Sequence, residues 1–376
     1  MAVLLGVYLG ELGGPPAFVV AAFGISLASG AVLNVIVGYY GDRYGRRRAM
    51  VLFGLLMTLA GTVLALAPSF PVALLALAFG AVSPTGTEVS PFLSIEQSIV
   101  AEVARHGRRT RAFAAYNLLG SLGASVGALA SGLPVLVAGG APLTADLLRP
   151  MFFLYAVLGV VAAALGNALP ESVEVESPRA TAVLSPESRS RIVRITALFS
   201  VDSFAGGFVL QGTMLYWFSL TYPGSEGLLG PLFAAAGVLT ALSFLVAARL
   251  GERIGLLETM VYTHIPSNIL LILIPLAPGF PLAVAAYLAR QALSQMDVPT
   301  RQAYLAGIVA REERTVANAF SNTARNTTQA IAPFLAGAVV ALLRELSVTF
   351  LVGGGLKIAY DVAIYRAFRH IRPGDV

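Results

Sequence analysis

The stretch "GYYGDRYGRRR" occupies residues 38–48, and five of its last eight residues carry charge. It stands in a chain of 376 residues, of which only 12% are charged and 57% are hydrophobic. A soluble domain carries about 25% charged residues, so this chain has about half of the charge that a water-exposed surface needs. Its charge is therefore concentrated at particular places.

Long apolar runs lie on both sides of this stretch and continue through the chain. A helix of about 20 apolar residues crosses the hydrocarbon core of a bilayer. The sequence therefore predicts an all-α polytopic membrane protein with twelve spans, at 1–11, 16–40, 48–67, 70–104, 108–139, 150–169, 190–221, 226–249, 256–277, 281–310, 312–343 and 347–368.

Most arginines fall on one side of this predicted topology, and only Arg149 and Arg344 lie in connections on the other. Positively charged connections remain in the cytoplasm. We therefore expect a multi-pass protein of the cell membrane, plasma or inner, with a cytoplasmic C-terminus. The net charge of +5 is then a topology signal, and we expect no binding to nucleic acid.

The polar segment 171–190 predicts a cytoplasmic connection between an N-terminal bundle of six helices, 1–170, and a C-terminal bundle, 191–376. The two halves resemble each other, since "GDRYG" at 41–45 recurs as "GERIG" at 251–255. A duplication of six spans is typical of secondary transporters, whose substrate site lies near mid-membrane at the repeat interface.

The opening stretch resembles the loop signature of the major facilitator superfamily, Gly-x-x-x-Asp-Arg-x-Gly-Arg-Arg-Arg. The matching residues are Gly38, Asp42, Arg43, Gly45, Arg46, Arg47 and Arg48. The resemblance implies two pseudo-symmetric six-helix bundles that work by alternating access. It also implies that this motif gates the cytoplasmic side, where Asp42 meets a helix N-terminus and an arginine of the other half, with a second copy at Gly251, Glu252 and Arg253. The alternative for Arg46, Arg47 and Arg48 is that they only anchor the topology.

The chain departs from the family pattern in two spans. Ala76 stands four residues before Gly80, where family members often carry arginine, and Ala128 replaces the proline of a fifth-span pattern associated with exporters. Residues 7–16 parallel 215–224, the outer end of the seventh span, so the first helix is predicted to be truncated at its N-terminus.

Ionisable residues inside spans are costly and face the protein interior or a water-filled cavity. The candidates within the predicted spans are Glu88, Glu96, Asp202, Arg290, Asp297, Arg301, Arg325, Lys357 and Asp361. Glu88 lies in the kink-prone segment 83–91, and burial favours a protonated carboxyl. Glu88 and Asp202 are therefore the proton-coupling candidates, with the alternative that Asp202 only caps its helix or pairs with Arg194.

Residues 94–117 align with 299–322, which makes Glu96 and Arg301 equivalent positions. Their opposite charges favour a salt bridge between the halves, with complementary walls of one site as the alternative. Asp297 and Arg301, four residues apart, could instead pair on one helix. In the eleventh span Asn318, Asn322, Arg325 and Gln329 share one helical face, which predicts a cavity lining; the alternative is hydrogen bonding between helices. Glu96, Asp297 and Arg301 complete the cavity and substrate candidates.

Other residues receive structural roles. Small residues allow helices to pack closely in membranes, which is the role predicted for Gly120, Gly123, Gly127 and Gly132. Tyr216 and Trp217 near the outer end of the seventh span predict an interfacial aromatic belt.

The sequence thus predicts a monomeric secondary active transporter of a small molecule, with proton-coupled export. The alternative is uptake or facilitated diffusion of an organic anion, because Arg301 and Arg325 suit an anion, whereas Glu88, Glu96 and Asp297 suit a cation. A membrane-embedded lipid-modifying enzyme would need clustered carboxylates for a metal, which the sequence lacks. A sensor on the same fold would be expected to carry a long soluble extension. We expect no cofactor, since the chain has no cysteine and only three scattered histidines.

Overall fold

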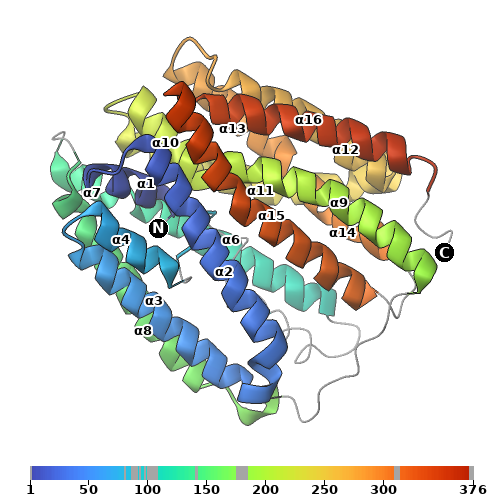
Figure 1. Cartoon of the computed structure of the whole chain (residues 1–376), viewed down its shortest axis with the longest axis horizontal. Coiled ribbons are helices and arrows are strands. Elements are labelled where there is room, and N and C mark those ends of the chain that lie inside the picture. Colours follow the sequence, from blue (N-terminus) through green and yellow to red (C-terminus); the bar gives the residue numbers. More distant parts are fainter. Residues whose placement is uncertain are drawn as a thin grey trace. The chain divides into compact units, whose positions relative to one another are not determined.

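The computed structural model describes residues 2–79, 82–85, 92, 95–96, 99, 109–139, 143–174, 185–308 and 314–371. Regular structure within these ranges is helical (Figure 1). The elements are, in chain order, α1 (Ala2–Glu11), α2 (Pro16–Tyr44), α3 (Arg46–Leu66), α4 (Phe70–Ala78), α6 (Arg109–Ala130), α7 (Leu133–Ala138), α8 (Ala145–Asn167), η1 (Glu171–Val173), α9 (Pro186–Phe208), α10 (Gln211–Thr221), α11 (Glu226–Ile254), α12 (Leu256–Leu273), α13 (Phe280–Ser294), α14 (Asp297–Gly307), α15 (Arg314–Leu343) and α16 (Val348–Phe368).

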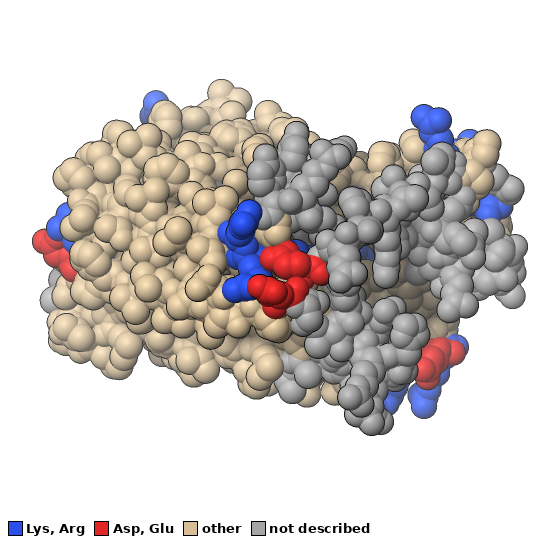
Figure 2. Space-filling model, turned by 90° about the horizontal axis from the view of Figure 1, so that it is seen from below, with Lys and Arg blue, Asp and Glu red and all other residues tan. Residues whose placement is uncertain are grey.

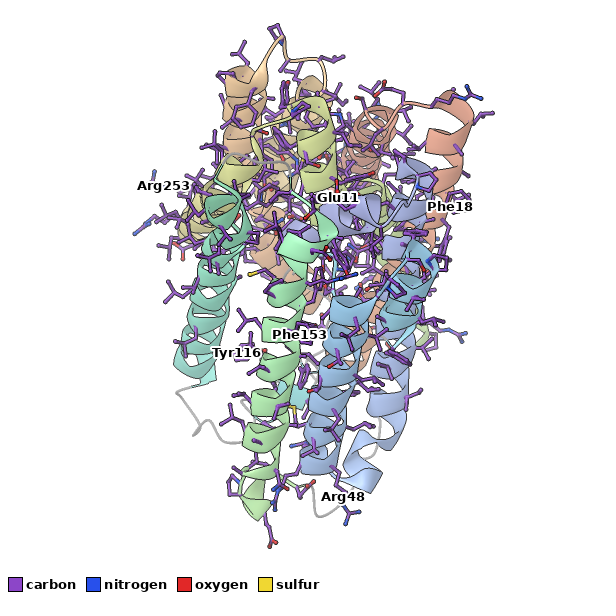
Figure 3. The ribbon with its side chains drawn as sticks, turned by 90° about the vertical axis from the view of Figure 1, so that its left-hand side faces the viewer. Glu11, Phe18, Arg48, Tyr116, Phe153 and Arg253 are labelled. Atoms are coloured by element: carbon purple, nitrogen blue, oxygen red, sulfur yellow. The ribbon has the colours of Figure 1, made fainter. Side chains whose placement is uncertain are left out.

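Eight segments within the described ranges are long and apolar enough to cross a bilayer. Large apolar side chains point outward from them, for example Phe153 on α8, which lies between Arg48 at one end of α3 and Glu11 at the opposite end of the same unit (Figure 3). Figure 2 shows a face on which most described side chains carry no charge. An apolar surface of this extent is stable when lipid covers it.

The helix bounds follow the predicted spans where one apolar run forms one helix. α16 begins at Val348, where a span over 347–368 is predicted. The predicted seventh span is instead broken between α9 and α10, because Leu210 has an extended backbone, with ψ of 159°. The amide of Gly212 donates to the carbonyl of Pro84, at 3.0 Å. A backbone amide just after the break is thus hydrogen-bonded to a segment distant in the sequence.

Contacts divide the chain into two compact units. The first unit comprises Met1–Arg179, Leu210–Pro231 and Pro333–Leu342, and the second comprises Ala180–Val209, Leu232–Ala332 and Leu343–Val376. The boundaries of the two bundles at 170 and 191 stay a prediction from the repeat.

In the first unit, α3 and α8 pack through glycines. A Cβ atom on Gly54 would lie 2.5 Å from the backbone nitrogen of Ala163, and one on Gly159 would lie 2.6 Å from that of Thr58. The two backbones therefore approach to a distance that a larger side chain would prevent. The close packing predicted for Gly120, Gly123 and Gly127 is wrong for the described chain, where a Cβ atom built on each of them meets no atom of a neighbouring segment within 4 Å. Close packing does occur at Gly132, between α6 and α7: a Cβ atom on Gly230 of α11 would lie 2.7 Å from the carbonyl oxygen of Ala128 and 3.4 Å from the amide nitrogen of Gly132.

The first unit also buries α10 against α1. Tyr216 and Trp217 are 4% and 2% exposed, so the interfacial belt predicted for them is wrong. A Cβ atom on Gly6 would lie 2.9 Å from Cβ of Tyr216, which places the tyrosine directly on α1. Hydropathy identifies the outer end of this span, but only the tertiary packing shows which side chains face lipid.

The second unit has a core of aromatic and aliphatic side chains from α9, α12, α14, α15 and α16. Phe199, Met260 and Tyr360 are each no more than 1% exposed. The hydroxyl of Tyr304 donates to the carbonyls of Phe368 at 3.2 Å and Ile371 at 2.8 Å. This apolar core lies beside the polar residues described next.

Candidate functional site

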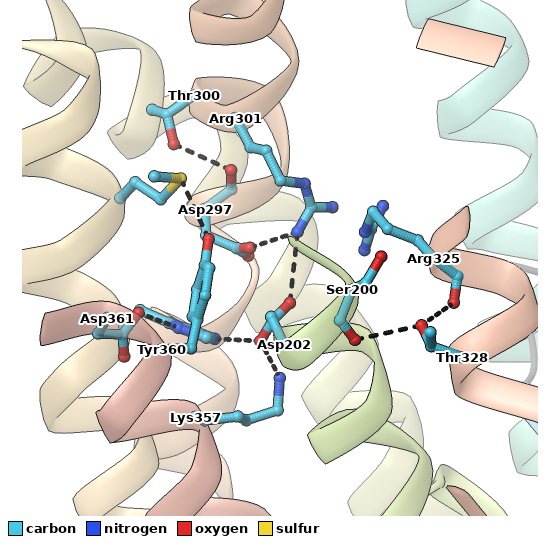
Figure 4. A network of polar contacts seen from close by, with 12 residues as sticks. Ser200, Asp202, Asp297, Thr300, Arg301, Arg325, Thr328, Lys357, Tyr360 and Asp361 are labelled. Atoms are coloured by element: carbon cyan, nitrogen blue, oxygen red, sulfur yellow. Dashed lines mark hydrogen bonds and ion pairs between the residues drawn. The ribbon is translucent and has the colours of Figure 1, made fainter. Parts of the chain in front are cut away.

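A buried charge network joins α9, α12, α14 and α16 in the second unit (Figure 4). Two glycines bring α16 close enough to its neighbours. A Cβ on Gly353 would lie 3.1 Å from the carbonyl oxygen of Ala205 on α9, and one on Gly354 would lie 3.1 Å from that of Asn268 on α12. Lys357 follows Gly353 by four residues and Asp361 follows Gly354 by seven, so these charges continue the same two helix faces.

Asp202 on α9 lies at the centre of the network and is 4% exposed. Nζ of Lys357 donates to its Oδ1 at 2.6 Å. Nη1 of Arg301 lies 3.6 Å from its Oδ2, and Nε2 of His264 lies 3.9 Å from its Oδ1. The alternative that Asp202 pairs with Arg194 is not the arrangement found, because the carboxylate of Asp202 forms its ion pairs with α12, α14 and α16.

His264 on α12 joins Asp202 to a second carboxylate. Its Nδ1 lies 2.8 Å from Oδ1 of Asp361, which is completely buried. Nδ2 of Asn268, one turn along α12, donates to the other oxygen of Asp361 at 3.0 Å. The ring of Tyr360 meets the imidazole edge-on, with ring centroids 6.2 Å apart. These contacts fix the orientation of both the imidazole and the carboxylate.

Arg301 and Asp297 lie on α14, where Nη1 of Arg301 donates to Oδ2 of Asp297 at 2.8 Å. The alternative of an intrahelical pair is therefore confirmed. The guanidinium also lies 5.7 Å from the ring centroid of Phe199, in cation–π range. Glu96 accepts a hydrogen bond from the hydroxyl of Tyr116 at 2.5 Å. The bridge from Glu96 to Arg301 concerns both units and stays a prediction.

Two further arginines, Arg290 on α13 and Arg325 on α15, are partly buried and interact electrostatically with Asp202. Beside Arg325, a side chain of α15 contacts the backbone of α9: the hydroxyl of Thr328 donates to the carbonyl of Ser200 at 3.1 Å (Figure 4). On the predicted polar face of α15, Asn322 is exposed, and Asn318, Arg325 and Gln329 are half-buried. Their role as a cavity lining stays a prediction.

The signature motif lies at the end of α2, which remains helical to Tyr44. Gly45 then turns the chain with a φ of 95°, a conformation that glycine adopts without strain. The carboxylate of Glu174 accepts hydrogen bonds from the amides of Arg46 at 2.7 Å and Arg47 at 3.2 Å. A carboxylate is stabilised at this position by the helix dipole and the unpaired first amides. The motif is thus joined to the segment that follows α8.

The second copy has the same turn. Gly251, Glu252 and Arg253 end α11, and Gly255 has a φ of 102° before α12 begins. Glu258, in the first turn of α12, lies against Gly255. Both glycines therefore precede a helix whose N-terminus faces a carboxylate, which supports the internal repeat inferred from the sequence.

Several predicted positions lie outside the described residues. Glu88 is one of them. Gly38, Asp42 and Arg43 belong to α2, but the surroundings of these positions lie outside the described part of the structure. Their gating and proton-coupling roles stay predictions.

The network also contains residues to which the sequence pattern assigns no role. The pattern identifies Lys357 and Asp361 only as charges within a span, and it does not connect His264 or Asn268 with a site. Lys357 is the single lysine of the chain, and an isolated lysine in an apolar span is a signal of function.

The sequence profile described as "Major Facilitator Superfamily" matches residues 1–289. The chain belongs to the Major Facilitator Superfamily. Membership of this superfamily supports secondary transport of a small molecule across a lipid bilayer. A membrane protein of Saccharomyces cerevisiae, the uncharacterized YJR124C, is 26% identical over 375 residues, which cover 90% of this chain and 84% of the yeast protein.

Solved structures of superfamily members share the fold. The nucleoside transporter NupG has a TM-score of 0.77 at 14% identity, over 98% of this chain and 94% of NupG. The xylose transporter XylE from E. coli, partially occluded and inward open, has a TM-score of 0.71 at 14% identity, over 98% and 93%. The human organic anion transporter MFSD10 has a TM-score of 0.61 at 16% identity, over 96% and 94%. The predicted all-α superfamily fold is confirmed, and at these identities the likeness concerns the fold alone.

Proposed function

We propose that this superfamily member exports a small molecule in exchange for protons, and that Asp202 takes part in the coupling. The buried network around Asp202 carries the proposal. Removing the charge partner of a buried ion costs about 3–5 kcal/mol. A movement that separates Asp202 from Lys357 therefore needs a replacement charge, and a proton entering the network supplies it.

The charges in direct contact favour one bound proton. Three carboxylates, Asp202, Asp297 and Asp361, face two permanent cations, Lys357 and Arg301, with His264 between them. This set carries a net charge of −1 when His264 is neutral and becomes neutral when one proton binds. A network that is one proton from neutrality can exchange that proton during a transport cycle.

The remaining parts of the proposal follow the family pattern. We assign gating of the cytoplasmic side to the motif at Gly38, Asp42, Arg43, Gly45 and Arg46 and to its copy at 251–253. Glu88 is the second proton-coupling candidate. The substrate is proposed to contact Glu96, Asp297, Arg301, Asn318, Asn322, Arg325 and Gln329. The protein would act as a monomer in the plasma or inner membrane, with its C-terminus in the cytoplasm.

A second candidate function is uptake or facilitated diffusion of an organic anion. Arg290 and Arg325 favour this function, because they interact electrostatically with Asp202. When they are added to Lys357 and Arg301, four permanent cations face three carboxylates. The excess of one positive charge would be neutralised by a substrate carboxylate or another monovalent anion.

A vesicle experiment separates the two candidates. Pools of organic anions, cations and neutral compounds are first screened for thermal stabilisation of the purified full chain at pH 6 and pH 8. A compound at 100 times its dissociation constant stabilises the folded state by about 2.7 kcal/mol. Each stabilising compound is then supplied to proteoliposomes across an imposed pH gradient, and protein-free vesicles correct for passive partition.

Exchange against protons accumulates the compound in the acidic compartment, whereas anion–proton cotransport accumulates it in the alkaline one, and facilitated diffusion accumulates it in neither. The Asp202→Asn variant should lose the dependence on the gradient. Asp146→Asn is the matched control, because the side chain of Asp146 is 80% exposed. Transport by the unmodified protein that ignores the pH gradient would refute proton coupling.

A further inference from the structure

His264 is the buried histidine of the described chain, and both nitrogens of its ring face carboxylates. Nδ1 lies at hydrogen-bond distance, 2.8 Å, from Oδ1 of Asp361. Nε2 lies 3.9 Å from Oδ1 of Asp202, within ion-pair range but beyond a hydrogen bond. A neutral imidazole has one N–H, so it can donate to only one of these two carboxylates. A protonated imidazole can donate to both.

Oδ1 of Asp202 is also the atom that binds Lys357. Nζ of Lys357 lies 2.6 Å from it, so lysine and imidazole approach the same oxygen from α16 and α12. Two cations on one oxygen repel each other. Contact between Lys357 and Asp202 therefore disfavours a proton on His264, and withdrawal of Lys357 leaves the oxygen open to an N–H of His264.

Resting on the proton coupling proposed above, we propose that His264 binds the transported proton at Nε2, in exchange with Lys357 for Oδ1 of Asp202. The proton enters from water as the Nε2–H bond forms, and it returns to water when that bond breaks. Asp202 stays ionised throughout, and its cationic partner changes from Lys357 to protonated His264. One charge replaces one charge, so the buried oxygen is compensated in both states.

Charged groups on every neighbouring helix act on this proton. Asp361 and Lys357 face His264 from α16, Asp202 from α9, and Asp297 and Arg301 from α14. Arg290 on α13 and Arg325 on α15 interact electrostatically with Asp202, and their positive charges add to those that repel the proton. The three carboxylates favour the proton by attraction. Asn268, one turn from His264 on α12, donates from Nδ2 to Oδ2 of Asp361 at 3.0 Å, and the same Nδ2 lies 3.2 Å from Nδ1 of His264.

The position of Asp361 restricts proton exchange on His264 to one ring nitrogen. Nδ1–H remains on Asp361 in either protonation state, which fixes the tautomer, so only Nε2 gains and loses the proton. Nε2 is the nitrogen that faces Asp202 and Lys357. Protonation is thereby linked to the contact between α9 and α16.

The test uses the full chain purified through a tag without histidine. A His106→Gln, His370→Gln double variant leaves His264 as the single histidine, since the chain has three. Nitrogen-15 labelling of histidine then reports Nδ1 and Nε2 separately by NMR. We expect Nε2 to titrate and Nδ1 to keep its proton. Absence of titration between pH 4 and pH 9 would overturn the proposal.

A second measurement tests the exchange with Lys357. In the same background, Lys357→Gln should make Nε2 titrate at higher pH because a competing cation is removed. Arg149→Gln, which removes a cation that pairs with Asp146 on α8, should leave the titration unchanged. A titration that Lys357→Gln does not move would also overturn the proposal.

Transport assays distinguish failure of the His264 assignment from failure of the proton coupling on which it rests. If the unmodified protein responds to a pH gradient and His264→Gln removes that response, the assignment is supported. If His264→Gln transports with an unchanged response, another residue carries the proton and the assignment falls while the proposed function stands. If the unmodified protein ignores the gradient, the proposed function falls and the assignment falls with it.

Discussion

Two ion pairs of equal length in this protein should contribute very differently to its stability. Nζ of Lys357 lies 2.6 Å from Asp202, and Nη1 of Arg149 lies 2.6 Å from Asp146. The side chains of the first pair are 11% and 6% exposed, and those of the second pair are 35% and 80% exposed. The two pairs therefore have the same distance between nitrogen and oxygen and differ in how far their side chains are buried.

The perturbation is Lys357→Met, which keeps the apolar stem of the side chain and removes its charge. Breaking a buried pair costs about 3–5 kcal/mol, because the remaining ion stays buried without compensation. Arg301 at 3.6 Å and His264 at 3.9 Å still face Asp202, so we expect about 3 kcal/mol, the lower end of this range. Arg149→Met should cost about 0.5 kcal/mol, because water screens the exposed pair.

The assay is the free energy of unfolding in mixed micelles, with helix loss followed by circular dichroism during titration with a denaturing detergent. Adding Asp202→Asn to Lys357→Met should recover about 2 kcal/mol, because the uncompensated charge is then removed. Equal losses for Lys357→Met and Arg149→Met would refute the reasoning, and so would additive losses in the double variant.

Two further predictions concern packing and capping in the first unit, with unfolding measured in the same way. Gly159→Leu should destabilise the protein by about 3 kcal/mol, because its Cβ atom would lie 2.6 Å from the backbone nitrogen of Thr58. Gly123→Leu is the control: a Cβ atom there meets open space, so the free energy of unfolding should change by under about 1 kcal/mol. Similar effects of the two variants would contradict the packing of α3 on α8. Glu174→Gln should lower the free energy of unfolding by about 1 kcal/mol, because an uncharged side chain interacts more weakly with the first backbone amides of α3. Glu171→Gln, at an exposed position, is the control. An unchanged stability of Glu174→Gln would argue against this capping role.

Hydropathy predicts the spans well wherever a single apolar run forms a single helix. It does not predict the break at Leu210, because hydropathy over a whole span does not register the local backbone freedom of Gly206, Gly207 and Gly212; at the break, the amide of Gly212 donates to the carbonyl of Pro84. Hydropathy also cannot distinguish lipid-facing from buried side chains, which is why it favours the membrane interface for Tyr216, a residue that is buried on α1.

For the candidate site, the cost of a charge in a membrane identifies Asp202, Asp297 and Arg301 from the sequence alone. Their partners are harder to find, because contact between helices leaves no local pattern. Lys357 and Asp361 are four residues apart and could pair on one helix, but each instead faces a different neighbouring helix. The glycines at 353 and 354 permit this approach, and nothing in the local sequence connects them to the charges that follow.

The two carboxylates at the helix starts have different consequences for synthesis of the chain. Glu258 reaches its position only three residues after Gly255, so the start of α12 is complete almost as soon as it is translated. Glu174 is separated from Arg46 by 128 residues. At a translation rate of about 5–20 residues per second, α3 exists for roughly 6–26 seconds before its carboxylate has been made. During that interval the nascent N-terminal helices must hold their place in the membrane without the contact that later joins the motif to the end of their bundle.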